Sequence, residues 1–98
     1  MPAKIIWAPN SLNDLREIVT FIAADNPPAA LRMGDRIFDA ADRLADFPNL
    51  GHPLRDKHRP NHRELVVADY RMIYRFDETA NALIILRVWH GARGDPQF

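Results

Sequence analysis

The run YRMIYRF at residues 70–76, followed by LIILRVWH at residues 83–90, decides the fold of this chain. Both runs are rich in β-branched and aromatic residues, which favour strands. Residues 77–81 between them suit a hairpin loop. A third β-rich run, Glu64–Val67, is separated from the first by Ala68-Asp69, which suits a two-residue turn. The three runs therefore predict an antiparallel meander.

Alternation within these runs predicts one apolar and one basic face of the sheet. The apolar side of the middle run should lie on a helical layer and carries Tyr70, Met72, Tyr74 and Phe76. The last run should alternate strictly, with Ile84, Leu86, Val88 and His90 on one side and Leu83, Ile85, Arg87 and Trp89 on the other. One basic set could assemble on the open face, namely Arg71, Arg75, Arg87 and Arg93 with His90.

The amino-terminal half reads as a strand followed by two helices. Lys4–Trp7 is short and β-rich, and Ser11 after it resembles an N-cap, with Asp14 as the acid of a capping box. A helical period of apolar residues then starts at Leu12. The run DNPP at residues 25–28 must end this helix, because proline cannot donate a helical hydrogen bond.

A second helical period follows the prolines and ends at Phe47-Pro48. The connection is very short, so the two helices should form an antiparallel hairpin. Residues 49–61 read as a loop with one short extended piece at most. The order strand, helix, helix, strand, strand, strand predicts one α+β two-layer domain over residues 1–98.

Composition narrows the classes of function. The chain has 98 residues, 13 basic and 13 acidic groups, and no cysteine, which excludes disulfides and thiolate chemistry and permits a cytoplasmic setting. No signal peptide or bilayer-spanning run is visible. Zero net charge argues against nucleic-acid binding by bulk electrostatics alone. The most basic stretch, residues 55–63, holds Arg55, Lys57, Arg59 and Arg63 against Asp56.

The basic set on the open face has two interpretations. Histidine and arginine can supply the acid, base and charge stabilisation for RNA cleavage without a metal. Arginines on a solvent-facing sheet can equally serve solubility alone. The histidines His52, His58 and His62 with Asp56 fit no ligand spacing, so we expect no metal site and no cofactor. Trp7 and Trp89 could stack on bases, although at least one should belong to the core.

Several strings together resemble the RelE/ParE toxin family over nearly the whole chain. They are IIW at residues 5–7, LNDLREI at 12–18, RELVV at 63–67, YRMIYR at 70–75 and VWHGAR at 88–93. The resemblance implies the same α+β fold and the toxin half of a bacterial type II toxin–antitoxin pair. It also implies a cytoplasmic protein without a membrane role that forms a hetero-oligomer with a small ParD- or RelB-like antitoxin.

The family contains two chemistries. RelE-like members are ribosome-dependent mRNA endonucleases, and by position Arg71 and Arg93 match their basic residues, with His90 as a substitute for the tyrosine that has no counterpart here. ParE-like members are non-enzymatic poisons of DNA gyrase, and REL at residues 63–65 and HGAR at 90–93 resemble them better. The gyrase poison is therefore favoured over the nuclease, and a degenerate copy that only binds antitoxin is a third alternative. Contacts to target or antitoxin are expected at Arg55, Lys57, Arg59, Arg63, Arg75 and Arg87.

Overall fold

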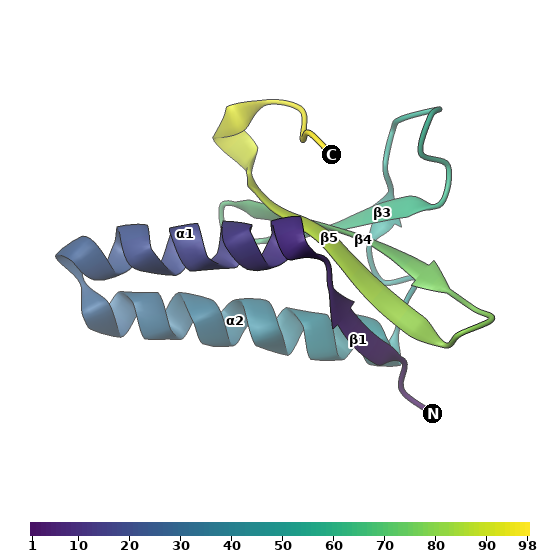
Figure 1. Ribbon diagram of the computed structural model, residues 1–98, viewed down its shortest axis with the longest axis horizontal. Helices are drawn as coiled ribbons and strands as arrows, with labels where there is room; N and C mark the ends of the chain where they lie inside the picture. Colours follow the sequence, from purple (N-terminus) through teal and green to yellow (C-terminus); the bar gives the residue numbers. More distant parts are fainter.

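The computed structural model describes all 98 residues, as two helices that lie on one face of a five-stranded sheet (Figure 1). The elements are β1 (Lys4–Trp7), α1 (Pro9–Asp25), α2 (Pro27–Asp46), β2 (His52–Pro53), β3 (His62–Val67), β4 (Tyr70–Asp77), β5 (Ala82–His90) and a 3₁₀ turn (Gly91–Arg93). The predicted α+β class, helical hairpin and meander are confirmed. Neither helix is long and apolar enough to cross a membrane.

The sheet has the strand order β1-β5-β4-β3-β2. Its centre is the predicted meander, in which β3, β4 and β5 pair antiparallel. Strand β1 adds to the edge of β5 in parallel, with Lys4 opposite Ala82 and Trp7 opposite Ile85. The two tight connections of the meander each contain a residue with positive φ, Ala68 at 54° and Asn81 at 47°. The first and last thirds of the chain are thus joined in one sheet.

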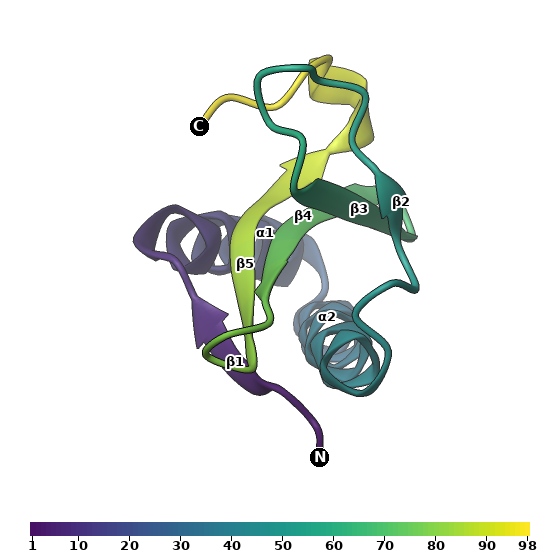
Figure 2. The same cartoon turned by 90° about the vertical axis from the view of Figure 1, so that its right-hand side faces the viewer.

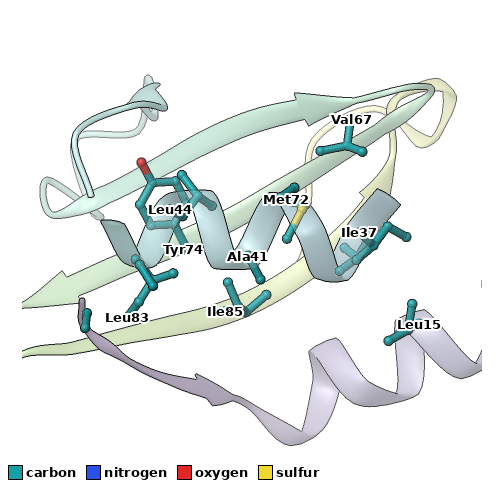
Figure 3. Close-up of a cluster of buried hydrophobic side chains, with 13 residues drawn as sticks. Leu15, Ile37, Ala41, Leu44, Val67, Met72, Tyr74, Leu83 and Ile85 are labelled. Atoms are coloured by element: carbon teal, nitrogen blue, oxygen red, sulfur yellow. The ribbon is translucent and has the colours of Figure 1, made fainter. Parts of the chain in front are cut away.

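The hydrophobic core lies between the helices and the sheet (Figure 3). Helix α2 contributes Ile37 and Leu44, which are fully buried, and α1 contributes Leu15. The facing side chains of the sheet are Met72, Tyr74, Leu83, Ile85 and Val88. The predicted apolar side of β4 is confirmed, since Tyr70 and Phe76 also pack against this core while Arg71 and Arg75 do not.

The predicted start of α1 is wrong. The helix begins at Pro9, with Ala8 in an extended conformation as a cap that makes no side-chain hydrogen bond. Proline suits the first helical position because its missing N–H would have no partner there. Ser11 therefore lies inside the helix, where its hydroxyl donates to the Ala8 carbonyl at 2.7 Å. Asp14 is buried and does not complete a capping box.

The predicted strict alternation of β5 is also wrong. Arg87 pairs with Ile73 but Ile85 pairs with Tyr74, so Leu86 is an extra residue in β5 and forms a bulge. Because a bulge shifts the alternation by one position, Leu83, Ile85 and Val88 all face the core. His90 is thereby brought to the helix-facing side of the sheet, opposite Tyr70.

Candidate functional site

The face of the sheet turned away from the helices carries most of the predicted basic residues. In the β3–β4 ladder, His62 lies opposite Arg75 and Val66 opposite Arg71, and these positions alternate with the core residues Leu65 and Met72. Trp89 of β5 lies opposite Arg71. We call this side of the sheet the open face.

Two segments border the open face, the loop at residues 54–61 and the carboxyl-terminal tail at residues 91–98 (Figure 2). The tail is held by side chains of the sheet: the Trp89 indole donates to the Gly94 carbonyl at 3.1 Å, and Arg87 donates to the Gln97 carbonyl at 2.6 Å. A cavity of about 220 Å³ lies between loop and tail, with Arg71 among its lining residues. The open face is therefore a shallow basin rather than a flat surface.

Arg71 is neutralised within this basin. Its Nε donates to Glu64 Oε2 at 2.7 Å, and the other carboxylate oxygen lies 3.0 Å from His52 Nε2. Arg71 and Glu64 are mostly shielded from solvent, with 23% and 14% of their side chains exposed. Glu64 was not predicted from the sequence as a site residue. Its place on the strand next to the one that carries Arg71 could have indicated the ion pair, because oppositely charged side chains on neighbouring strands stabilise each other.

Arg87 is neutralised by α1. Its guanidinium donates to both carboxylate oxygens of Asp14 at 2.7 Å, and the Val88 N–H donates to the same carboxylate at 3.0 Å. The pair holds the pKa of Arg87 above its ordinary value, mainly through the hydrogen bonds to Asp14. Strand β1 ends before it reaches Val88, and Asp14 accepts the hydrogen bond from the Val88 N–H at this unpaired edge of β5. Nothing in the local sequence could have indicated this contact.

His90 does not join the basic set, so the predicted assembly of five residues on one face is wrong. Its ring stacks edge-on against Tyr70 with 5.3 Å between centroids, and its Nδ1 accepts the Ala92 N–H at 3.0 Å. A shallow pocket that His90 and Tyr70 share with Phe21 opens toward α1. Arg87 and His90 are three residues apart in β5, so alternation places them on opposite faces, and the bulge at Leu86 brings Arg87 to the open face and His90 to the helix side.

The tryptophans have internal roles. Trp89 is buried, and the guanidinium of Arg93 lies 4.1 Å from its ring centroid, in cation–π geometry. Trp7 packs edge-on against Phe38 of α2. The prediction that at least one tryptophan belongs to the folded interior is confirmed.

Of the basic side chains in residues 55–63, some form ion pairs or hydrogen bonds within the protein and others do not. Arg55 and Lys57 are exposed and form no ion pair, whereas Arg59 reaches Asp56 at 3.3 Å and Arg63 donates to the Gly51 carbonyl at 2.7 Å. The His58 N–H, which donates to Asp56, is the main cause that lowers the pKa of that carboxyl. No three histidine or acidic side chains lie close enough together to hold a metal ion.

Comparison with known proteins agrees with this geometry. Residues 5–94 match the family described as the ParE toxin of the type II toxin–antitoxin system parDE. The chain belongs to the ParE toxin family. This ParE-family toxin is 40% identical to the Y4kP protein of Sinorhizobium fredii over 96% of its own length and 94% of the relative. It is 36% identical to the toxin RelE2 of Caulobacter vibrioides over 93% and 98% of the two chains.

Solved structures share the fold of this ParE-family toxin. The RelBE2 toxin–antitoxin complex of Mycobacterium tuberculosis superimposes with a TM-score of 0.72 at 25% identity, covering 92% of this chain and 99% of the other. The chromosomal ParDE system of Pseudomonas aeruginosa gives a TM-score of 0.74 at 20% identity, covering 90% and 95%. The chain is therefore the toxin component of a type II toxin–antitoxin system, and its matches include both ParE and RelE toxins.

Proposed function

We propose that this toxin poisons DNA gyrase without catalysing a reaction of its own. The observation that carries the proposal is the separation of Arg71 and His90 on opposite faces of the sheet. A metal-independent nuclease needs an acid and a base that both reach the one phosphate it cleaves. The charge of Arg71 is also occupied by Glu64, which leaves little of it for a transition state.

The second candidate is a ribosome-dependent mRNA endonuclease. It is favoured by the named relative RelE2 and by His62, which shares the open face with Arg71 and Arg75. In this function Arg71 and Arg93 would stabilise the charge on the phosphate. His90 would not take part, because the sheet stands between it and these arginines.

We further propose that a small antitoxin neutralises the toxin in a hetero-oligomer in the cytoplasm. Structural relatives are toxin–antitoxin complexes. The helices also expose large apolar side chains, with Phe21 at 80% and Leu31 at 71% exposure, which a protein partner could cover. Arg55 and Lys57 remain free for an acidic partner or for the target, whereas Arg63 and Arg87 already hold partners within the fold.

The target is tested by inducing the chain alone in its host while the DNA-damage response and mRNA integrity are followed in the same culture. The proposal expects damage signalling, stabilised gyrase cleavage complexes and intact transcripts. Rapid transcript cleavage without damage signalling would instead establish the endonuclease.

Two substitutions sharpen the test. His90→Ala should remain toxic through the same target under either candidate function. Loss of toxicity in a folded variant would contradict the placement of His90 away from the functional site. Arg71→Ala should abolish transcript cleavage if the toxin is a nuclease.

Antitoxin binding is tested by co-purification with the product of the adjacent small gene, and a toxin recovered alone would contradict it.

A further inference from the structure

The pocket between α1 and the adjoining ends of β4 and β5 combines aromatic walls with a free carboxylate. Its volume is about 370 Å³, and its lining residues are Glu17, Ile18, Phe21, Tyr70 and His90. Glu17 and Phe21 are four residues apart in α1, so they are neighbours on the helix surface. We call this cavity the α1 pocket. It lies on the side of the sheet that the helices cover, away from the open face (Figure 1).

Three aromatic rings line the α1 pocket. The rings of Tyr70 and His90 are 5.3 Å apart between centroids and stand at 89° to each other, so they form adjacent walls at nearly a right angle. Phe21 supplies the third ring from the helix, and 80% of its surface is exposed. Aromatic rings attract cations, because the faces of the rings are electrically negative. A cavity with several such rings therefore suits a cationic group.

The charged groups around the α1 pocket also favour a cation. Glu17 is exposed and enters none of the ion pairs of the structure. The pKa of Tyr70 is raised mainly by burial and then by the charge of Asp69, which places a second acidic group beside the ring. The pKa of Arg87 is raised mainly by Asp14 and more weakly by Glu17, but the Arg87 guanidinium already donates to Asp14. The protein thus leaves the Glu17 carboxylate without a partner of its own.

We propose that the α1 pocket receives an arginine side chain of the antitoxin. A guanidinium is planar, so it can lie against an aromatic ring while its N–H groups donate to a carboxylate through two parallel hydrogen bonds. A lysine ammonium lacks this flat fork, and an apolar side chain would leave the charge of Glu17 unpaired. The choice of partner rests on the proposed neutralisation by an antitoxin, whereas the chemistry of the pocket does not.

Nuclear magnetic resonance of the Tyr70 and His90 ring signals tests this chemistry on the full chain, which has only two tyrosines and four histidines. The probe is Nα-acetyl-arginine N-methylamide, and the citrulline compound of the same shape is its uncharged control. The arginine probe should shift both ring signals saturably, and the citrulline and lysine compounds should bind more weakly. The proposal is overturned if the arginine probe moves neither ring, or if the citrulline or lysine compound binds as tightly.

Two substitutions separate the charge from the aromatic wall. Glu17→Gln should weaken binding of the arginine probe about fivefold, the size of an exposed ion pair. Phe21→Leu should weaken it about threefold, because leucine keeps the apolar surface but has no aromatic face. Asp35→Asn and Phe47→Leu, at exposed positions that do not line the pocket, are the matched controls and should bind as the parent does. Equal binding by the parent and both pocket variants, all of them folded, would overturn the proposal.

The purified toxin–antitoxin complex tests the occupant. Glu17→Gln should weaken antitoxin binding by a similar factor, and one arginine of the antitoxin, when replaced by glutamine, should reduce affinity for the parent toxin but not for Glu17→Gln. Equal antitoxin binding by the parent and Glu17→Gln would show that the antitoxin does not fill the pocket, which overturns the proposal. If the antitoxin fails to bind the parent toxin at all, the proposed neutralisation is wrong, and the titration with the arginine probe still decides the chemistry of the pocket.

Discussion

Asp14 accepts three hydrogen bonds, two from the Arg87 guanidinium and one from the Val88 N–H. Only 7% of the Asp14 side chain and 15% of the Arg87 side chain are exposed to solvent. Removing one partner of such a buried pair leaves the other charge without compensation, which is costly. At the scale of single residues, this carboxylate fixes α1 against β5.

Asp14→Ala should therefore lower the free energy of unfolding by about 3 kcal/mol, measured by urea denaturation. Asp14→Asn should lose less, because the amide oxygen can still accept the Val88 N–H. Asp35→Ala, an exposed carboxylate of α2, is the control and should change stability by less than about 0.5 kcal/mol. An equal loss from Asp14→Ala and Asp35→Ala would contradict the structural role of the pair.

His62 should make stability depend on pH. The folded protein binds its proton less tightly than the unfolded chain, since burial lowers the pKa of His62 from 6.5. Stability should therefore rise with pH through the interval between that lowered pKa and 6.5, and should be lost as pH falls through the same interval. Urea unfolding compared on both sides of this interval should show a smaller pH effect in His62→Gln than in the parent. An unchanged pH effect in the variant would contradict the lowered pKa.

At the scale of elements, Tyr74 connects β4 to the segment that leads from α2 into β2. Its hydroxyl donates to the Pro48 carbonyl at 2.7 Å and accepts the Gly51 N–H at 2.9 Å, and the side chain is fully buried. Gly51 itself has no room for a side chain, because a Cβ there would lie 2.5 Å from the Glu64 carbonyl oxygen. This contact positions β2, and with it His52 beside Glu64.

Tyr74→Phe should cost about 1–3 kcal/mol of unfolding free energy, because a buried N–H and carbonyl lose their partner. Tyr70→Phe is the matched control, since the Tyr70 hydroxyl makes no hydrogen bond in the structure and only a small change is expected. Hydrogen exchange of the Gly51 amide should also become faster in Tyr74→Phe. Equal stabilities of the two variants would show that the hydroxyl does not anchor this segment.

At the scale of the whole molecule, the pairing of β1 with β5 joins the two ends of the chain in one sheet. The sheet is complete only when both ends are in place, so the helical and sheet layers should unfold together. The two tryptophans report on opposite sides of the sheet: Trp7 contacts Phe38 of α2, and Trp89 contacts Arg93 on the open face.

Trp89→Phe leaves Trp7 as the only tryptophan, and Trp7→Phe leaves Trp89. In each variant the fluorescence of the remaining tryptophan should follow the same urea transition as the far-ultraviolet circular dichroism. Coincident transitions are the mark of two-state unfolding, because one cooperative step changes every probe at once. A separate transition for Trp89 would indicate that the tail and open face unfold independently of the helical layer.

Local patterns in the sequence determined the elements and part of the site. The alternation in β4 placed Arg71 and Arg75 away from the core, and Pro27-Pro28 separated the helices, because both signals act between near neighbours. The strings shared with RelE/ParE toxins likewise indicated the family that the comparisons show.

Tertiary structure decided the contacts that determine which side chains are available for function. The Asp14–Arg87 pair, the parallel β1–β5 register and the bulge at Leu86 depend on segments far apart in the chain, and no local periodicity encodes their pairing. The bulge moved His90 to the helix side, and the separate β3–β4 register placed His62 opposite Arg75 on the open face. The sequence therefore supplied the basic residues, whereas packing between distant segments determined which of them are neutralised and which remain free to bind.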